Sequence, residues 1–168
     1  MDASLERAES RRGLLARAVA LVGGAGLSTA SAPAVLGKDY ASPREALDEI
    51  DRLAVACGMR LGALRRARSG AEVLVTRFLA ALDRHRATRK DVRSRFGLAR
   101  GVDPASQVGE ADADLEGLRQ ALDDLMIGYA ESLPVFGDSN TVSRLAVDMV
   151  EVSKLRTVID LWVVAEGA

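Results

Sequence analysis

Apolar residues recur at three- and four-residue spacing in four segments of the chain, 43–69, 71–97, 110–132 and 140–165. This spacing places apolar side chains on one face of an α-helix, whereas no segment sustains the apolar–polar alternation of a half-buried strand. The connections are short except for the one near residue 100. The pattern therefore predicts an all-α protein, an antiparallel four-helix bundle whose helices have two dozen residues or so.

Turn and capping residues mark the ends of the predicted helices. Ser42 is the expected N-cap of the first helix, with Pro43 at its first position and Glu45 completing a capping box. Gly97 is expected to end the second helix. The third is predicted to begin at about Glu110, in a run of acidic residues that suits the positive end of a helix dipole. These acidic residues are Glu110, Asp112, Asp114 and Glu116.

The apolar faces of the four helices are expected to meet in one core. In the second helix this face includes Val73, Phe78 and His85. The inward positions of the first and third helices carry Leu, Ile, Ala, Cys and Tyr, with no carboxylate. The fourth helix ends in an apolar stretch, 162–164, which we assign to the core, the alternative being a seam for a second subunit. Such an interior would offer few oxygen and nitrogen ligands to a metal ion.

Residues 1–34 have the organisation of a secretory signal peptide. A charged lead, 1–9, precedes an apolar region, 18–27, and Ala32-Pro33-Ala34 supplies the small residues of a cleavage site. We place the cut after Ala34, which leaves 35–168 as a single four-helix-bundle domain. The alternative is an uncleaved amphipathic or membrane-anchoring helix. Its apolar run of about ten residues is shorter than the roughly 20 that span a bilayer.

The residues SRRGLL at 10–15 resemble the twin-arginine translocation signal, Ser/Thr-Arg-Arg-x-Phe-Leu-Lys, with Leu14 at the Phe position. The resemblance implies a bacterial protein exported in the folded state to the periplasm. Arg11 and Arg12 would then be read by the translocation machinery. Cys57 is the single cysteine and can form no internal disulfide, so we expect it to be a buried apolar residue.

Charge is unevenly distributed along the chain. Residues 60–100 carry 12 Lys and Arg against 3 Asp and Glu, whereas residues 101–168 carry 4 against 13. We expect the basic hairpin to pack beside the acidic one, so that each neutralises the other. The alternative is an anionic partner, either an acidic protein face or an anionic membrane surface. Nucleic acid is not expected, because Phe96 is the single aromatic residue of the basic run 84–100.

Two segments resemble the ferritin-like superfamily. FLAALDRHR at 78–86 is similar to the second helix of small exported ferritin-like proteins, which carries a Glu-x-x-His element, and DMVEVSK at 148–154 is similar to the fourth. The resemblance implies a ferritin-like bundle with a di-iron site built from inward carboxylates and histidines. Leu82 stands at a Glu position, however, and Lys154 at a His position. We therefore expect no metal site, and the remaining candidate ligands are His85 and Glu151.

His85 is the single histidine, and we expect it near the solvent-exposed end of its helix, hydrogen-bonded to a neighbouring side chain. The alternative is that His85 is a haem or metal ligand. The sequence contains no nucleophile elbow and no phosphate loop, so we predict no catalytic and no cofactor-binding residues from it. It favours a non-catalytic exported bundle that binds a periplasmic protein or a second copy of itself. The alternative is a metal- or haem-binding protein or oxidoreductase, with iron or haem as cofactor. Its unconventional site would use His85, Glu151, Tyr129 and Cys57.

Overall fold

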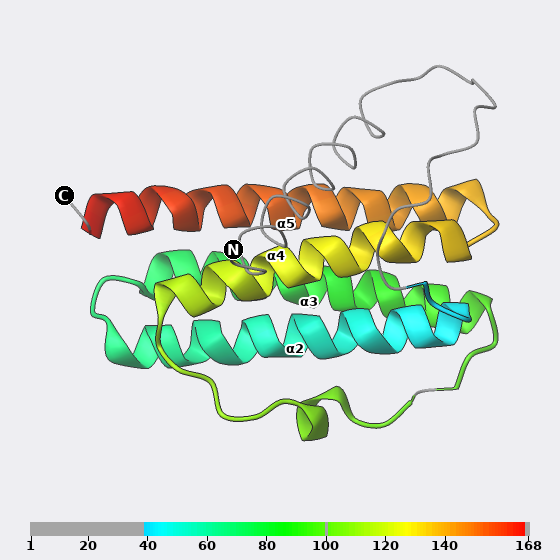
Figure 1. Ribbon diagram of the computed structural model, residues 1–168, viewed down its shortest axis with the longest axis horizontal. Coiled ribbons are helices and arrows are strands. Elements are labelled where there is room, and N and C mark those ends of the chain that lie inside the picture. The colour runs from blue at the N-terminus through cyan, green and yellow to red at the C-terminus, as the bar shows by residue number, and fades with distance from the viewer. Residues whose placement is uncertain (1–38, 100, 167–168) are drawn as a thin grey trace, which may run out of the picture. The chain divides into compact units, whose positions relative to one another are not determined.

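The computed structural model describes residues 39–99 and 101–166, which form four α-helices and no strand (Figure 1). The predicted signal segment, with Arg11 and Arg12, lies outside these residues. The α-helices are α2 (Pro43–Ala67), α3 (Glu72–Arg95), α4 (Leu115–Ser132) and α5 (Ser139–Glu166), and the 3-10 helices are η1 (Pro104–Gln107) and η2 (Leu133–Val135). The prediction of an all-α protein with four helices is confirmed for this part of the chain.

The four helices pack against one another as in a helical bundle (Figure 1). α2 contacts α3 and α4, and α5 contacts the same two helices. The main neighbours of α3 are therefore α2 and α5. The connection from α3 to α4 contains η1, which packs against α2. No helix within the described ranges combines the length and the apolar character needed to cross a lipid bilayer.

Apolar side chains at helical spacing fill the space between the helices. Among the buried residues are Leu47, Ile50, Cys57, Leu61, Phe78, Leu118, Leu122, Leu125, Leu145, Val152 and Ile159. Burying one large side chain of this kind stabilises the fold by about 1.5 to 3 kcal/mol. The predicted core stripes are thus confirmed at most positions, and the predicted burial of Cys57 is confirmed as well.

Two apolar residues that we placed in the core lie outside it. Val73 is 69% exposed, because Val75 and Phe78 occupy the inward positions of the first turns of α3. Val164 is 70% exposed, and Trp162 is half-buried. Val164 follows the buried Ile159 by five residues, which turns it about 140° round the helix and away from the core.

The start of α2 follows the predicted capping pattern. Ser42 Oγ accepts a hydrogen bond from the backbone N–H of Glu45 at 3.3 Å, and the Glu45 carboxylate accepts one from the N–H of Ala41 at 2.9 Å. α3 ends two residues before Gly97, which takes a φ of 62° that glycine adopts without strain. Both predicted helix boundaries are therefore confirmed.

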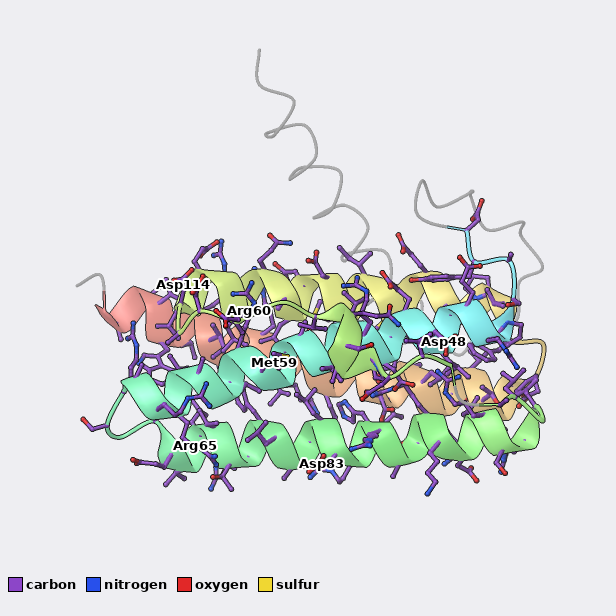
Figure 2. All side chains as sticks on the ribbon, turned by 90° about the horizontal axis from the view of Figure 1, so that it is seen from below. Asp48, Met59, Arg60, Arg65, Asp83 and Asp114 are labelled. Carbon is purple, nitrogen blue, oxygen red and sulfur yellow. The ribbon has the colours of Figure 1, made fainter. Side chains whose placement is uncertain are left out.

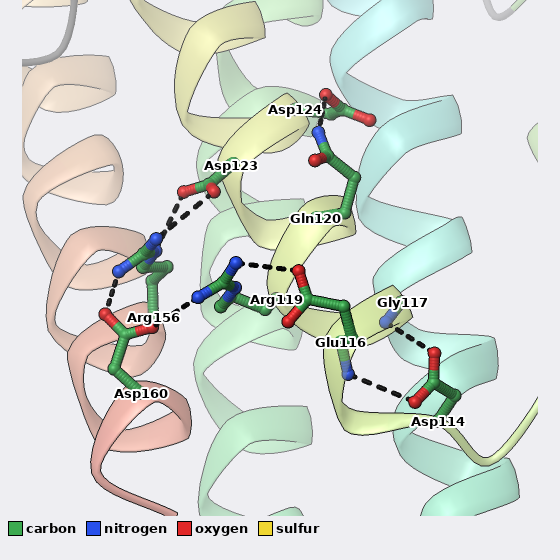
Figure 3. Close-up of polar contacts among 9 residues, drawn as sticks. All are labelled: Asp114, Glu116, Gly117, Arg119, Gln120, Asp123, Asp124, Arg156 and Asp160. Atoms are coloured by element: carbon green, nitrogen blue, oxygen red, sulfur yellow. Dashed lines mark hydrogen bonds and ion pairs between the residues drawn. The ribbon is translucent and has the colours of Figure 1, made fainter. Parts of the chain in front are cut away.

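α4 begins at Leu115, so the prediction of a helix from about Glu110 is wrong. Asp114 is the N-cap, and its carboxylate accepts hydrogen bonds from the N–H groups of Glu116 at 3.2 Å and Gly117 at 2.9 Å (Figure 3). The preceding segment 108–114 is not helical, and its two end residues have extended backbone angles. Exposed acidic residues alternate there with half-buried alanines, which is the two-residue period of extended chain rather than the period of a helix.

Candidate functional site

The interior of the bundle contains charged and polar side chains that we call the polar cluster. Its centre lies on α3, where His85, Arg89 and Arg93 follow one another at four-residue spacing and so share the inward face. These three residues are 1%, 3% and 8% exposed. The other members of the cluster are Asp48 and Asp51 from α2, Tyr129 from α4, and Asp148 and Glu151 from α5.

Arg89 lies in the middle of the polar cluster. Its Nε donates a hydrogen bond to Asp51 Oδ1 at 2.6 Å, and its Nη1 donates one to Tyr129 Oη at 2.7 Å. Burial lowers the pKa of Arg89, but Tyr129 and Asp51 raise it by more, so the net shift is upward. Burial also raises the pKa of Tyr129, which keeps its hydroxyl protonated. Arg89 therefore places a permanent positive charge in the core.

Arg93 extends this ion pairing by one helical turn. Its Nη2 donates hydrogen bonds to Asp48 Oδ1 at 2.6 Å and to Asp51 Oδ2 at 2.9 Å. Asp51 thus bridges the two buried arginines. A buried guanidinium is tolerated only when a counter-ion and hydrogen bonds compensate for its lost hydration. The two aspartates of α2 supply counter-ions and bonds to Nη2 of Arg93, whereas its buried Nη1 has no hydrogen-bond partner among the described residues.

His85 forms the other end of the polar cluster. Its Nε2 lies 2.8 Å from Glu151 Oε2 and 3.8 Å from Asp148 Oδ1. The hydrogen bond with His85 lowers the pKa of Glu151, whereas burial raises the pKa of Asp148. The His85 ring also meets the Tyr129 ring edge-on, with centroids 6.4 Å apart. Contacts therefore run without a break from Glu151 on α5, through His85, Tyr129 and Arg89, to the aspartates of α2.

The prediction of an apolar interior is wrong for this region, because His85, Arg89, Arg93 and Asp148 are buried there. The buried residues of α2 are apolar, as predicted, and the half-buried Asp48 and Asp51 pair with Arg89 and Arg93 at the edge of the core. His85 Nε2 has a neighbouring partner, as expected, but Nδ1 has no hydrogen-bond partner among the described residues, and the ring is buried rather than placed at a solvent-exposed helix end. One pattern in the sequence could have revealed Arg89, because it follows His85 by four residues and so continues the inward stripe of α3.

The polar cluster does not fit the di-iron site that the ferritin-like resemblance implies. That site needs several inward carboxylates together with histidines. Leu82 is buried where a Glu is required, and Lys154 is exposed where a His is required. Arg89 adds a fixed positive charge, which opposes the entry of metal cations. Within 39–99 and 101–166, no three His, Cys, Asp or Glu side chains are grouped so that they could hold a metal ion.

The structure brings together three of the four residues of the unconventional site. His85 contacts both Glu151 and Tyr129. Cys57 is buried on α2, where the charges that act on its thiol are those of Asp124 and Arg60. Burial raises the pKa of Cys57 to about 12, so the thiolate that could act as a nucleophile or a metal ligand is scarce at neutral pH.

The surface ion pairs differ from the expected neutralisation of a basic hairpin by an acidic one. One pair of the expected kind, Arg84 with Glu151, joins α3 to α5 at 3.5 Å. Two acidic residues of α4, Glu116 and Asp123, are instead held by arginines of α4 and α5. Arg156 pairs with Asp123 and Asp160, and Arg119 pairs with Glu116 (Figure 3). The two hairpins do pack beside each other, α2 against α4 and α3 against α5, but Arg77, Arg86 and Lys90 are exposed on α3 and pair with no carboxylate of the described residues.

A cleft between α2 and α4 has a volume of about 220 Å³ and is lined by charged, polar and apolar residues, among them Arg52, Leu53, Arg60, Gln120 and Asp124. Sites for small molecules usually have volumes of about 300 to 1,000 Å³. The cleft therefore offers less room than a typical ligand site.

Comparison of the chain with protein families, with curated proteins and with solved structures finds no match.

Proposed function

We propose that this protein is a non-catalytic, exported, ferritin-like bundle that binds a partner protein in the periplasm. An antiparallel ferritin-like arrangement is supported by the contacts of α2 and α5, each of which packs against both α3 and α4. It is also supported by the long connection beside α2, since ferritin-like bundles have one long crossover between their two helical hairpins. In Figure 1 this connection leaves the end of α3 and reaches the start of α4 at the other end of the helices.

The burial of Arg89 between Asp51 and Tyr129 carries the non-catalytic part of the proposal. In ferritin-like enzymes, inward carboxylates bind a pair of metal ions. Here the guanidinium of Arg89 binds one oxygen of Asp51, and Arg93 binds the other oxygen of Asp51 and one oxygen of Asp48. The charge on the α2 side of the polar cluster is therefore balanced by the protein itself, which supports a structural role for this part of the interior.

Export is supported by the twin-arginine pattern at 10–15. Replacing Arg11 and Arg12 together with lysine is expected to retain the protein in the cytoplasm, measured by fractionation of cells that express either form. A double variant that still reaches the periplasm would contradict this route.

Metal analysis combined with partner capture tests the functional proposal. Protein purified after export is expected to contain no stoichiometric iron, copper or haem, and to retain a defined protein partner or a second copy. Absence of any protein partner, the second copy included, would contradict the binding role.

A metal- or haem-binding role is the second candidate, favoured by the approach of Glu151 and Asp148 to His85. It predicts bound metal or haem that is lost in His85→Ala and kept in the exposed control Lys154→Ala. That result in the same metal analysis would replace the non-catalytic proposal.

A further inference from the structure

We propose that the outward face of α3 binds the acidic segment 110–116 of a second copy of this chain. This inference rests on the proposed role in partner binding and names the partner. The basic face consists of the exposed residues Arg77, Arg84, Arg86 and Lys90. The acidic segment presents the exposed residues Glu110, Asp112, Asp114 and Glu116.

The basic face carries four exposed cations and, between positions 77 and 90, one exposed anion, Asp83 (Figure 2). Helix geometry places Arg77 and Arg84 along one flank of α3 and Arg86 and Lys90 along the other, with Asp83 on the ridge between the flanks beside Ala80 and Ala87. Among the residues that the structure describes, Arg77, Arg86 and Lys90 form no ion pair and no side-chain hydrogen bond. Their charges are thus left for a partner.

The carboxylates of the acidic segment are spaced like the cations of the basic face. Glu110 and Asp112 are two residues apart, which in extended chain is about 6.6 Å. Arg86 and Lys90 are four residues apart, which on a helix is about 6 Å along the axis. Neither Glu110 nor Asp112 forms an ion pair with the other described residues. Two consecutive carboxylates can therefore face two consecutive cations.

The two patches cannot neutralise each other within one copy. The acidic segment leads into α4, whereas α3 packs mainly against α2 and α5. Figure 2 shows Asp83 on α3 and Asp114 at the start of α4 on opposite sides of α2. Contact between them is therefore intermolecular, and because it joins two different patches it is head-to-tail. Exposed ion pairs are individually weak, so the association depends on several of them and on low salt.

Sedimentation velocity of the full-length chain at several protein concentrations tests the proposal. We expect self-association at about 0.01 M salt and its loss at about 1 M, where the Debye length falls from about 30 Å to about 3 Å. Arg86→Glu with Lys90→Glu reverses the basic face, and Glu110→Lys with Asp112→Lys reverses the acidic segment. Each double variant alone should associate at least about tenfold more weakly, because like charges then meet.

A mixture of the two double variants is the decisive measurement. The first keeps a normal acidic segment and the second keeps a normal basic face, so the mixture should associate although neither variant does so alone. The control, Arg44→Glu with Lys154→Glu, makes the same change in charge as the Arg86 and Lys90 variant, but at exposed positions of α2 and α5, and should associate like the wild type. Circular dichroism establishes that every variant is folded.

Three results would overturn the inference. They are a wild-type chain that stays monomeric at low salt, a mixture that fails to associate, and a monomeric chain that instead sediments with phosphatidylglycerol vesicles. If the chain is monomeric yet captures a different periplasmic protein, the inference fails while the proposed function stands.

Discussion

Replacing Arg89 with methionine removes the buried cation that holds Asp51 and Tyr129 together. The variant keeps an unbranched side chain but leaves the Tyr129 hydroxyl without its donor and leaves Asp51 with Arg93. Removing one partner of a buried ion pair costs about 3 to 5 kcal/mol of unfolding free energy. Because Arg93 still lies 2.9 Å from Asp51 and Asp51 is only half-buried, we expect the low end of that range.

Urea unfolding followed by circular dichroism measures this effect. A loss of about 3 kcal/mol, with a slope of about 1 to 3 kcal/mol per molar urea, lowers the midpoint by about 1 to 3 M. The matched control is Arg86→Met, at an exposed position on the same helix, which should change the unfolding free energy by less than about 0.5 kcal/mol. If Arg89→Met changes the unfolding free energy by no more than that control does, and the slope is unchanged, the assignment of Arg89 as a buried structural cation is refuted.

A double-mutant cycle with Asp51→Asn separates the ion pair from the packing of the arginine stem. The double variant should lose less stability than the sum of the two single variants, because each single change already breaks the pair. Additive losses would indicate that Arg89 stabilises the protein through its packing or its bond to Tyr129, and not through the ion pair with Asp51.

Three further predictions concern single residues. Asp114→Ala should lower the unfolding free energy by about 1 kcal/mol through loss of the N-cap of α4, whereas Asp112→Ala should change it by less than about 0.5 kcal/mol in the same urea assay. Glu151→Gln should be less stable than wild type above the ordinary pKa of glutamate. Because the folded-state pKa is lowered, this advantage of the wild type should vanish as the pH falls through that lowered value, and a difference that grows on acidification would contradict the reasoning. Cys57 should react slowly with a thiol reagent in the folded protein at neutral pH and quickly in urea, and equal rates would show that its thiol is accessible.

The helices could be predicted from the sequence because local rules determine them. Ser42 and Pro43 mark the start of α2 through capping chemistry, and Leu118, Leu122 and Leu125 mark the inward face of α4 through spacing. The start of α4 was missed because acidic residues are favourable both in a first helical turn and in an exposed extended segment. The helix begins after Asp114 because the Asp114 carboxylate caps it there, which leaves the acidic residues before it in the extended segment.

The polar cluster could not be predicted in the same way, because its stability depends on contacts between helices. Taken alone, Arg89 and Arg93 belong to a basic run that is typical of a solvated helix face. Their burial becomes favourable only when Asp48 and Asp51, about 40 residues earlier in the chain, lie beside them. Sequence spacing indicates which positions face inward, but the counter-ions of a buried charge depend on which helices are neighbours.

The long connection between α3 and α4 is the covalent link between the α2–α3 hairpin and the α4–α5 hairpin. We expect the packed hairpins to stay together without it. Its residues at 102, 103 and 105–107 are exposed, so a protease can reach them, whereas the core side chains on either side of the link are held by each other. A chain nicked at η1 would stay together as two fragments. The same two fragments, produced separately, would be expected to reassemble on mixing.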